Sequence, residues 1–114
     1  MSSPQTDIDP AQLVDLLKRG EQVQVVDVRE PYEREAGHIA DTRHIPMVEL
    51  TSRAMEIDRD LPVVFYCRVG SRSDMAAQAF RASGYTALSM RGGLVRWADE
   101  NRPLSPEGGH VADH

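Results

Sequence analysis

The sequence predicts an α/β fold: a single domain with a mostly parallel central sheet and helices on both faces. Two observations lead to this prediction. The chain of 114 residues is long enough for one compact domain and too short for two ordinary ones. Short β-branched runs alternate along it with segments of helical periodicity. Such alternation over short spans is typical of a parallel sheet covered by helices.

The first half of the chain begins with a helix and a buried strand. An aspartate that can cap a helix and a proline suited to its first position stand at 9–10, and Gly20 is a suitable stop. The run at 23–28 (VQVVDV) then predicts a buried strand. A second helix is expected to begin at Pro31 and to end at Gly37.

The second half repeats this alternation. The expected elements are, in order, a short extended piece ending at 45–46, a weakly helical stretch at 47–55, a second buried strand at 62–66, a helix closed by Ser83-Gly84, a third strand at 86–90 and a last short helix around Trp97. The second buried strand runs directly into Cys67, which is therefore expected at the sheet edge where ligands bind.

The two ends of the chain differ in composition from its middle. We expect residues 9–103 to form the domain, with a flexible N-terminus at 1–8 and a flexible tail at 104–114 that packs loosely if at all. The first residues lack the basic and apolar regions of a signal peptide. No stretch approaches the roughly 20 apolar residues that cross a bilayer, so no membrane association is expected.

Charge and cysteine content narrow the possible functions. The net charge of −5 argues against binding to nucleic acid. The only cysteine, Cys67, cannot form an internal disulfide, which fits a reducing compartment and predicts a cytoplasmic protein. Two isolated histidines near the C-terminus, His110 and His114, are too few to indicate a metal site. No metal and no cofactor are expected.

The segment 67–73 (CRVGSRS) joins the second buried strand to the helix that follows it. The free amides and the dipole at the start of a helix attract negative charge, and Arg68 and Arg72 add positive charge. Gly70 lets the backbone curl so that successive N–H groups face inward. The sequence therefore predicts a stabilised thiolate at Cys67 with an anion cradle in front of it.

A lone cysteine at the end of a strand is more often a small buried hydrophobic residue than a catalyst. Cys67 alone would therefore not indicate an enzyme. The neighbouring glycine and the two arginines at a strand-to-helix junction favour the catalytic interpretation.

Several short motifs resemble the signatures of single-domain rhodaneses. They are, in chain order, Val26-Asp27-Val28-Arg29-Glu30-Pro31-x-Glu33, Gly37-His38-Ile39 followed by Ile45-Pro46, Cys67-x-x-Gly70-x-Arg72-Ser73, and Arg91-Gly92-Gly93-Leu94-x-x-Trp97. The motifs follow the order expected of the family and span nearly the whole chain apart from its ends.

The chain departs from the family pattern in two places. Rhodaneses commonly have Gly-Ala where this chain has Asp41-Thr42, and often a glycine where Asn101-Arg102 stands. Asparagine is the next-best residue after glycine for a left-handed backbone, so the change at Asn101 is mild. The change at Asp41 concerns local loop geometry and leaves the cysteine chemistry intact.

The resemblance implies a rhodanese-like domain that acts as a sulfurtransferase, with Cys67 as the catalytic nucleophile. Cys67 would take the outer sulfur of thiosulfate or of a low-molecular-weight persulfide and carry it as a persulfide to cyanide or a thiol. Without a second cysteine the sulfur must leave to an external acceptor. The implied partners are this small donor, a thiol acceptor and a partner protein of a sulfur relay. The substrate-binding residues would be Arg68, Val69, Gly70, Ser71, Arg72 and Ser73.

Two roles remain open for Arg72. It either binds substrate or locks the loop through an ion pair with Asp27 or Glu33. Arg68 is expected to bind the donor at the rim of the loop. His38 is interpreted as a packing and hydrogen-bonding residue and not as a general base.

Two alternative functions compete with sulfur transfer. A cysteine phosphatase or an arsenate reductase is the nearest, since some cysteine phosphatases resemble rhodaneses in fold. This chain has four residues between Cys67 and Arg72, one fewer than those phosphatases, and Tyr66 where they usually have histidine. The tighter loop suits a single sulfur atom better than a phosphoryl group. A non-catalytic docking module is less favoured, because such modules often lack the cysteine.

Overall fold

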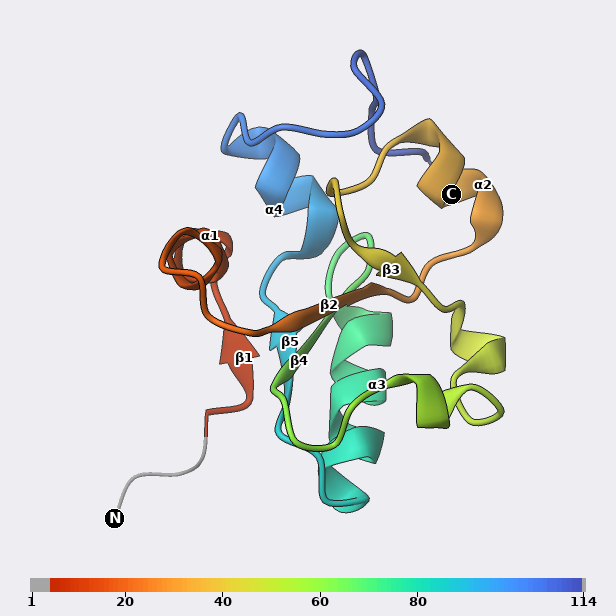
Figure 1. The fold of residues 1–114 in the computed structure, drawn as a ribbon. Helices are drawn as coiled ribbons and strands as arrows, with labels where there is room; N and C mark the ends of the chain where they lie inside the picture. Colours follow the sequence, from red (N-terminus) through yellow and green to blue (C-terminus); the bar gives the residue numbers. More distant parts are fainter. Residues whose placement is uncertain (1–4, 114) are drawn as a thin grey trace.

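The centre of the fold is a sheet of five strands, all paired in parallel (Figure 1). The computed structural model describes residues 5–113. Its strands lie in the order β1-β5-β4-β2-β3, with β4 in the centre. The elements are β1 (Asp7–Ile8), α1 (Pro10–Lys18), β2 (Gln24–Asp27), α2 (Pro31–Ala36), β3 (Arg43–His44), η1 (Met47–Glu49), η2 (Ala54–Glu56), β4 (Val63–Tyr66), α3 (Ser71–Ala82), β5 (Ala87–Met90) and α4 (Gly93–Asp99). The predicted α/β class is confirmed.

The central strand β4 shows how the two faces of the sheet are covered. Val63 and Phe65 belong to a buried cluster with α3, where the rings of Phe65 and Phe80 lie 5.0 Å apart. Val64 and Tyr66 point to the opposite face, into a second cluster with α1 and α4. All four residues of β4 are buried, as expected of a strand covered on both sides.

Side chains near the helix starts explain where the first two helices begin. The Gln12 side chain accepts the Asp9 N–H at 2.9 Å at the start of α1, and Glu33 does the same for Glu30 at 2.9 Å at the start of α2. In each helix a proline follows the cap residue, where its missing N–H costs nothing. The stretch 47–55, expected as one weak helix, instead forms the two short 3₁₀ helices η1 and η2.

Within residues 5–113, two non-glycine residues have a left-handed backbone, Asp41 with φ 63° and Asn101 with φ 60°. These are the two positions at which the sequence departs from the rhodanese pattern by lacking glycine. Asparagine and aspartate tolerate this conformation better than other side chains do. The chain therefore turns at these positions without glycine.

Both ends of the described chain contact the domain. β1 pairs with β5 and so extends the sheet within the stretch expected to be a flexible N-terminus; residues 1–4 lie outside the described part. Near the other end, Ser105 pairs with His38 through two backbone hydrogen bonds of 2.7 and 2.9 Å, and the His110 N–H donates to Ala36. The segment expected to pack loosely thus lies against α2 as far as it is described.

Candidate active site

Cys67 follows directly on the central strand β4, and its side chain is buried. Two backbone N–H groups donate to its sulfur: that of Gly70 lies 3.0 Å from Sγ and that of Ser73 lies 3.4 Å away. The Ser73 hydroxyl oxygen is 3.5 Å from the same sulfur. In the deprotonated form, Sγ would accept several hydrogen bonds at once, which is the arrangement that stabilises an anion.

The loop geometry depends on Gly70. This residue has φ 113° and immediately precedes Ser71, the first residue of α3. Residues with a Cβ rarely adopt this conformation, so glycine is the residue that lets the loop turn its amides toward the sulfur. Because α3 extends over 12 residues, its dipole adds to the favourable field for negative charge at Sγ.

Arg72 links the loop to α2. Its two terminal nitrogens lie 2.7 and 2.9 Å from the two carboxylate oxygens of Glu33, whose side chain is buried. These hydrogen bonds raise the pKa of Arg72, and the charges of Glu33 and Cys67 raise it further. Of the two acidic partners considered from sequence, Glu33 is the one that Arg72 pairs with. A role for Arg72 in substrate binding stays a prediction.

Asp27 forms a different ion pair, with Arg29, at the carboxyl end of β2. Both side chains are fully buried, and both Asp27 oxygens accept from the guanidinium at 2.8 Å. Arg29 also donates to the Gly37 carbonyl at 2.8 Å, which ties the end of α2 to the sheet. Burial, with the charge of Asp27 next in size, raises the pKa of the neighbouring Tyr66 to about 12. Through these contacts, the Asp27–Arg29 ion pair joins α2 to the sheet next to the site, and its role is structural.

The first turn of α4 holds the loop from the other side. The N–H groups of Leu94 and Val95 donate to the carbonyls of Cys67 and Arg68 at 2.8 and 3.0 Å. A Cβ on Gly93 would lie 2.5 Å from the Arg68 oxygen and 2.7 Å from the Cys67 oxygen. Only glycine allows this approach, which explains one of the two glycines in the motif before the last helix.

The C-terminal segment reaches the site loop at Arg68. Nε of Arg68 donates to the Ala112 carbonyl at 3.1 Å, and a terminal nitrogen lies 3.7 Å from the exposed Asp113 carboxylate. Ala112 itself is 9% exposed. The arginine expected at the rim of the loop is therefore in contact with residues from the far end of the chain.

The other residues predicted for the loop differ in exposure. Val69 is half-exposed and Ser71 is exposed, whereas Ser73 is buried. Behind Ser73 lies Ser89 of β5, with its hydroxyl oxygen 2.7 Å from that of Ser73. Ser89 was not identified from the sequence. The available signal was one hydroxyl in an otherwise apolar strand, ALSM.

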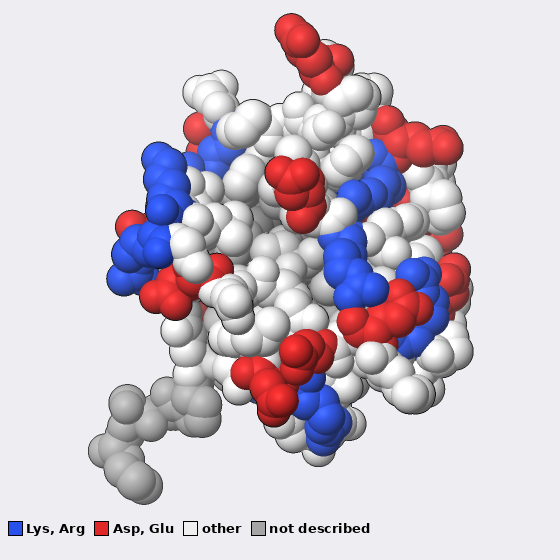
Figure 2. All heavy atoms as spheres, viewed as in Figure 1, with Lys and Arg blue, Asp and Glu red and all other residues white. Residues whose placement is uncertain are grey.

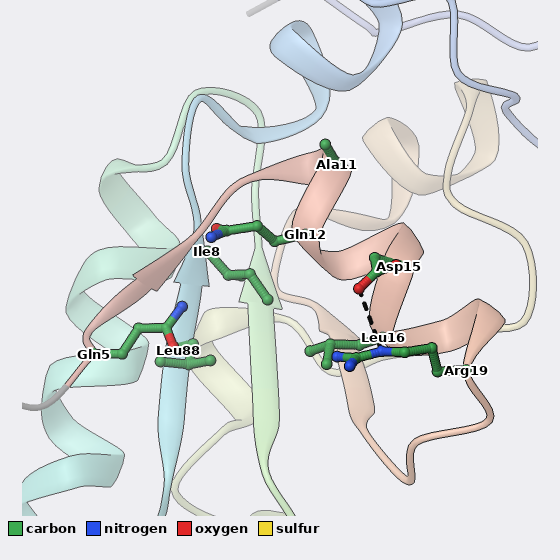
Figure 3. A pocket seen from close by; sticks show the side chains of 8 residues that line it. All are labelled: Gln5, Ile8, Ala11, Gln12, Asp15, Leu16, Arg19 and Leu88. Carbon is green, nitrogen blue, oxygen red and sulfur yellow. Dashed lines mark ion pairs between the residues drawn. The ribbon is translucent and has the colours of Figure 1, made fainter.

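Two cavities lie away from this loop. One of about 440 Å³ opens beside α1 and β1 (Figure 3), where Asp15 and Arg19 form an ion pair at 3.3 Å. Another, of about 670 Å³, lies beside it and shares Gln5, Leu16 and Leu88. No residue of the 67–73 loop lines either cavity. Nothing in them brings a nucleophile next to a second reactive group, so the chemistry is assigned to the loop.

The face seen in Figure 2 carries basic and acidic side chains in alternation, without a broad patch of one sign. Several arginines in the described part of the chain form ion pairs, for example Arg53 with Glu49 and Arg91 with Asp7. Across residues 5–113, no group of three or more histidine, cysteine or acidic side chains is arranged to hold a metal ion. Within the same range no helix has the length and apolar character needed to cross a membrane.

Comparison with protein families gives a match to the rhodanese-like domain over residues 9–100. A protein named sulfurtransferase from Allochromatium vinosum is 39% identical over 104 residues, covering 90% of this chain and 97% of that protein. The uncharacterized protein YqhL of Bacillus subtilis is 45% identical over 75 residues, but this covers only 60% of that protein and 65% of this chain. The match to the probable adenylyltransferase/sulfurtransferase MoeZ of Mycobacterium tuberculosis, 32% identical, spans 84% of this chain and a quarter (25%) of that protein.

Solved structures share the fold. A rhodanese-related protein from Thermoplasma volcanium superimposes with a TM-score of 0.80 at 31% identity, covering 87% of this chain and 96% of that one. A protein from Rhodopseudomonas palustris described as a possible tyrosine phosphatase superimposes with a TM-score of 0.77 at 25% identity. The superposition covers 89% of this chain and 85% of that one.

Proposed function

The chain belongs to the rhodanese-like domain family, and we propose that it moves sulfur from thiosulfate or a small persulfide to a thiol or cyanide through a Cys67 persulfide. The observation that carries this proposal is the position of Sγ. It lies at the N-terminus of α3 with the amides of Gly70 and Ser73 directed at it. Relatives named sulfurtransferases support the same reaction class.

The proposed reaction has two steps. The Cys67 thiolate attacks the outer sulfur of thiosulfate, a Cys67–sulfur bond forms, the S–S bond of thiosulfate breaks, and sulfite leaves with the electron pair. Cyanide or a thiolate then attacks the outer sulfur of the Cys67 persulfide. Thiocyanate or the acceptor's persulfide leaves, and the Cys67 thiolate is restored. The loop amides hold negative charge on sulfur throughout, as preorganised donors do in other enzymes.

Intact mass spectrometry tests the first step directly. Incubation with thiosulfate should add the mass of one sulfur atom to the protein, and cyanide should remove it. Because Cys67 is the only cysteine in the chain, the added sulfur can be assigned to its thiol. A protein whose mass stays unchanged with both thiosulfate and glutathione persulfide would contradict the proposal.

A cysteine phosphatase remains the second candidate, favoured by the structural likeness to the protein described as a possible tyrosine phosphatase. A thiolate in an arginine-containing loop is also the nucleophile of cysteine phosphatases, where it accepts a phosphoryl group. However, the loop here has four residues between Cys67 and Arg72, which leaves less room for such a group. We expect no hydrolysis of p-nitrophenyl phosphate by a preparation that takes up sulfur.

We expect Arg68→Ala to raise the KM for thiosulfate about ten-fold, the usual order for a lost hydrogen bond to a charged group. The reason is that the Arg68 guanidinium stands beside the loop and already lies near an acidic side chain, Asp113. An anionic donor would take the place of that carboxylate. Initial rates over a range of thiosulfate concentrations give the KM.

The donor and a distant arginine supply the controls for this experiment. The KM for an uncharged sulfur donor should change less than the KM for thiosulfate. Arg19→Ala removes the same charge from the surface at the end of α1 and should leave both values as they are. Equal effects of Arg68→Ala on charged and uncharged donors would count against donor binding by Arg68.

A further inference from the structure

Two buried serines form a second layer behind the Cys67 sulfur. Ser73 belongs to the first turn of α3 and Ser89 to β5, and both residues are buried. Their hydroxyl oxygens lie 2.7 Å apart. Ser73 Oγ is also 3.5 Å from Sγ of Cys67 and 3.1 Å from the Gly70 carbonyl oxygen. A chain of three polar side chains thus runs from the nucleophile into the sheet.

The number of protons on Cys67, Ser73 and Ser89 limits which hydrogen bonds these three side chains can form. Each hydroxyl has one proton to donate and can accept further hydrogen bonds. With Cys67 as a thiol, the S–H can donate to Ser73, and Ser73 can donate to the Gly70 carbonyl. With Cys67 as a thiolate, the sulfur can only accept, so the Ser73 proton must turn toward Sγ to stabilise it.

That turn requires that Ser73 does not donate its proton to Ser89, and a hydrogen bond in the opposite direction, from Ser89 to Ser73, ensures this. If Ser89 donates its proton to Ser73 Oγ, the Ser73 proton is left to point at Gly70 or at Sγ. A hydroxyl that accepts one hydrogen bond also becomes a stronger donor in the next. We propose that Ser89 is a positioning residue that directs the Ser73 hydroxyl toward the Cys67 thiolate. This inference deepens the proposed function and rests on it for its catalytic meaning.

The position of Ser89 in the sheet supports this role over simple packing. Its neighbours within β5, Leu88 and Met90, are apolar, and its register partner on β4 is Phe65. A hydroxyl buried in such surroundings is costly unless it is hydrogen-bonded. An alanine at position 89 would fill this space without the cost of burying a hydroxyl group. A charged side chain that acts electrostatically on Cys67 is Arg72, which is held by Glu33 and is present in every variant below.

The test measures how fast iodoacetamide alkylates Cys67 across a range of pH, in the full-length protein. At a pH where only part of the thiol is ionised, Ser73→Ala should slow alkylation about ten-fold and Ser89→Ala about three-fold, the first being the usual order for a lost hydrogen bond to a charge. The midpoint of each pH profile should move upward. Ser89→Thr, which keeps a hydroxyl on the same carbon, should restore the rate.

The double variant separates positioning from packing. If Ser89 acts through Ser73, Ser89→Ala should have no further effect on alkylation when Ser73 is already alanine, since coupled residues are not additive. Additive effects would overturn the proposal, as would an unchanged alkylation profile in Ser89→Ala or a failure of Ser89→Thr to restore it. If the four variants were merely less stable, the effects of the two alanine substitutions would not depend on each other and Ser89→Thr would not restore the rate.

Alkylation does not depend on sulfur transfer, so the two proposals can fail separately. If thiosulfate adds no sulfur while Ser89→Ala still slows alkylation, the proposed function is wrong and the positioning role stands. If sulfur is added but the serines leave alkylation unchanged, the positioning role is wrong and the proposed function stands.

Discussion

Cys67→Ser is expected to reduce sulfur transfer by roughly a thousand-fold or more, to the background rate, because loss of a covalent nucleophile is rarely compensated. A serine hydroxyl fits the same space but is hardly ionised near neutral pH, so it would not attack sulfur. Thiocyanate formation from thiosulfate and cyanide gives the rate. The variant should also show no mass gain with thiosulfate.

The fold of Cys67→Ser should be kept, since the substitution exchanges one atom for a smaller one in a buried position. Its circular dichroism and urea unfolding should match those of the original chain. A useful control adds Ser83→Cys, an exposed thiol just after the last residue of α3, at the far end of a helix about 18 Å long. This double variant should remain inactive. Substantial activity in Cys67→Ser would mean that the loop thiol is not the nucleophile, and activity that appears only in the double variant would mean that a thiol outside the loop is sufficient.

Asp27→Asn is expected to lower the free energy of unfolding by about 3–5 kcal/mol, the usual cost of breaking a buried ion pair. The substitution keeps the shape of the side chain but leaves the Arg29 cation buried without its counter-charge. It also replaces an oxygen that accepts from the guanidinium by an amide that donates. The midpoint of urea unfolding should move to a lower concentration with little change in slope.

An ion pair at the surface provides the matched control. Asp15 and Arg19 lie 3.3 Å apart with 66% and 58% of their side chains exposed. Exposed pairs contribute little, so Asp15→Asn should change stability by less than about 0.5 kcal/mol. If the two substitutions cost the same, the buried pair would not have the supporting role assigned to it here.

The order of strands and helices could be predicted from sequence because each element has a local signal. Hydrophobic periodicity marks the strands at 24–27 and 63–66, and proline after a capping residue marks the starts of α1 and α2. The strand β1 has only two residues, too few to show a pattern. It exists because β5 offers a free edge, which only the assembled sheet reveals.

The site loop could be predicted for a similar reason, since residues 67–73 are contiguous and contain their own glycine, arginines and thiol. What the sequence left open was how distant segments meet this loop. Glu33 was one of two candidates for Arg72, and Ser89 was not considered. Each of these contacts joins residues from separate elements, so no local pattern distinguishes them from unrelated polar residues.

The contact between Ala112 and Arg68 has a practical consequence for anyone who expresses this protein. Asp113 lies beside Arg68 of the loop that carries the thiol, so a purification tag added at the C-terminus would be attached a short way along the chain from this contact. A polyhistidine tag attached there would bring imidazoles and bound nickel close to a reactive sulfur. β1 lies at one edge of the sheet, and α2 lies on the opposite side of the molecule (Figure 1). A tag placed ahead of β1 would leave the contact between Arg68 and the C-terminal segment unchanged.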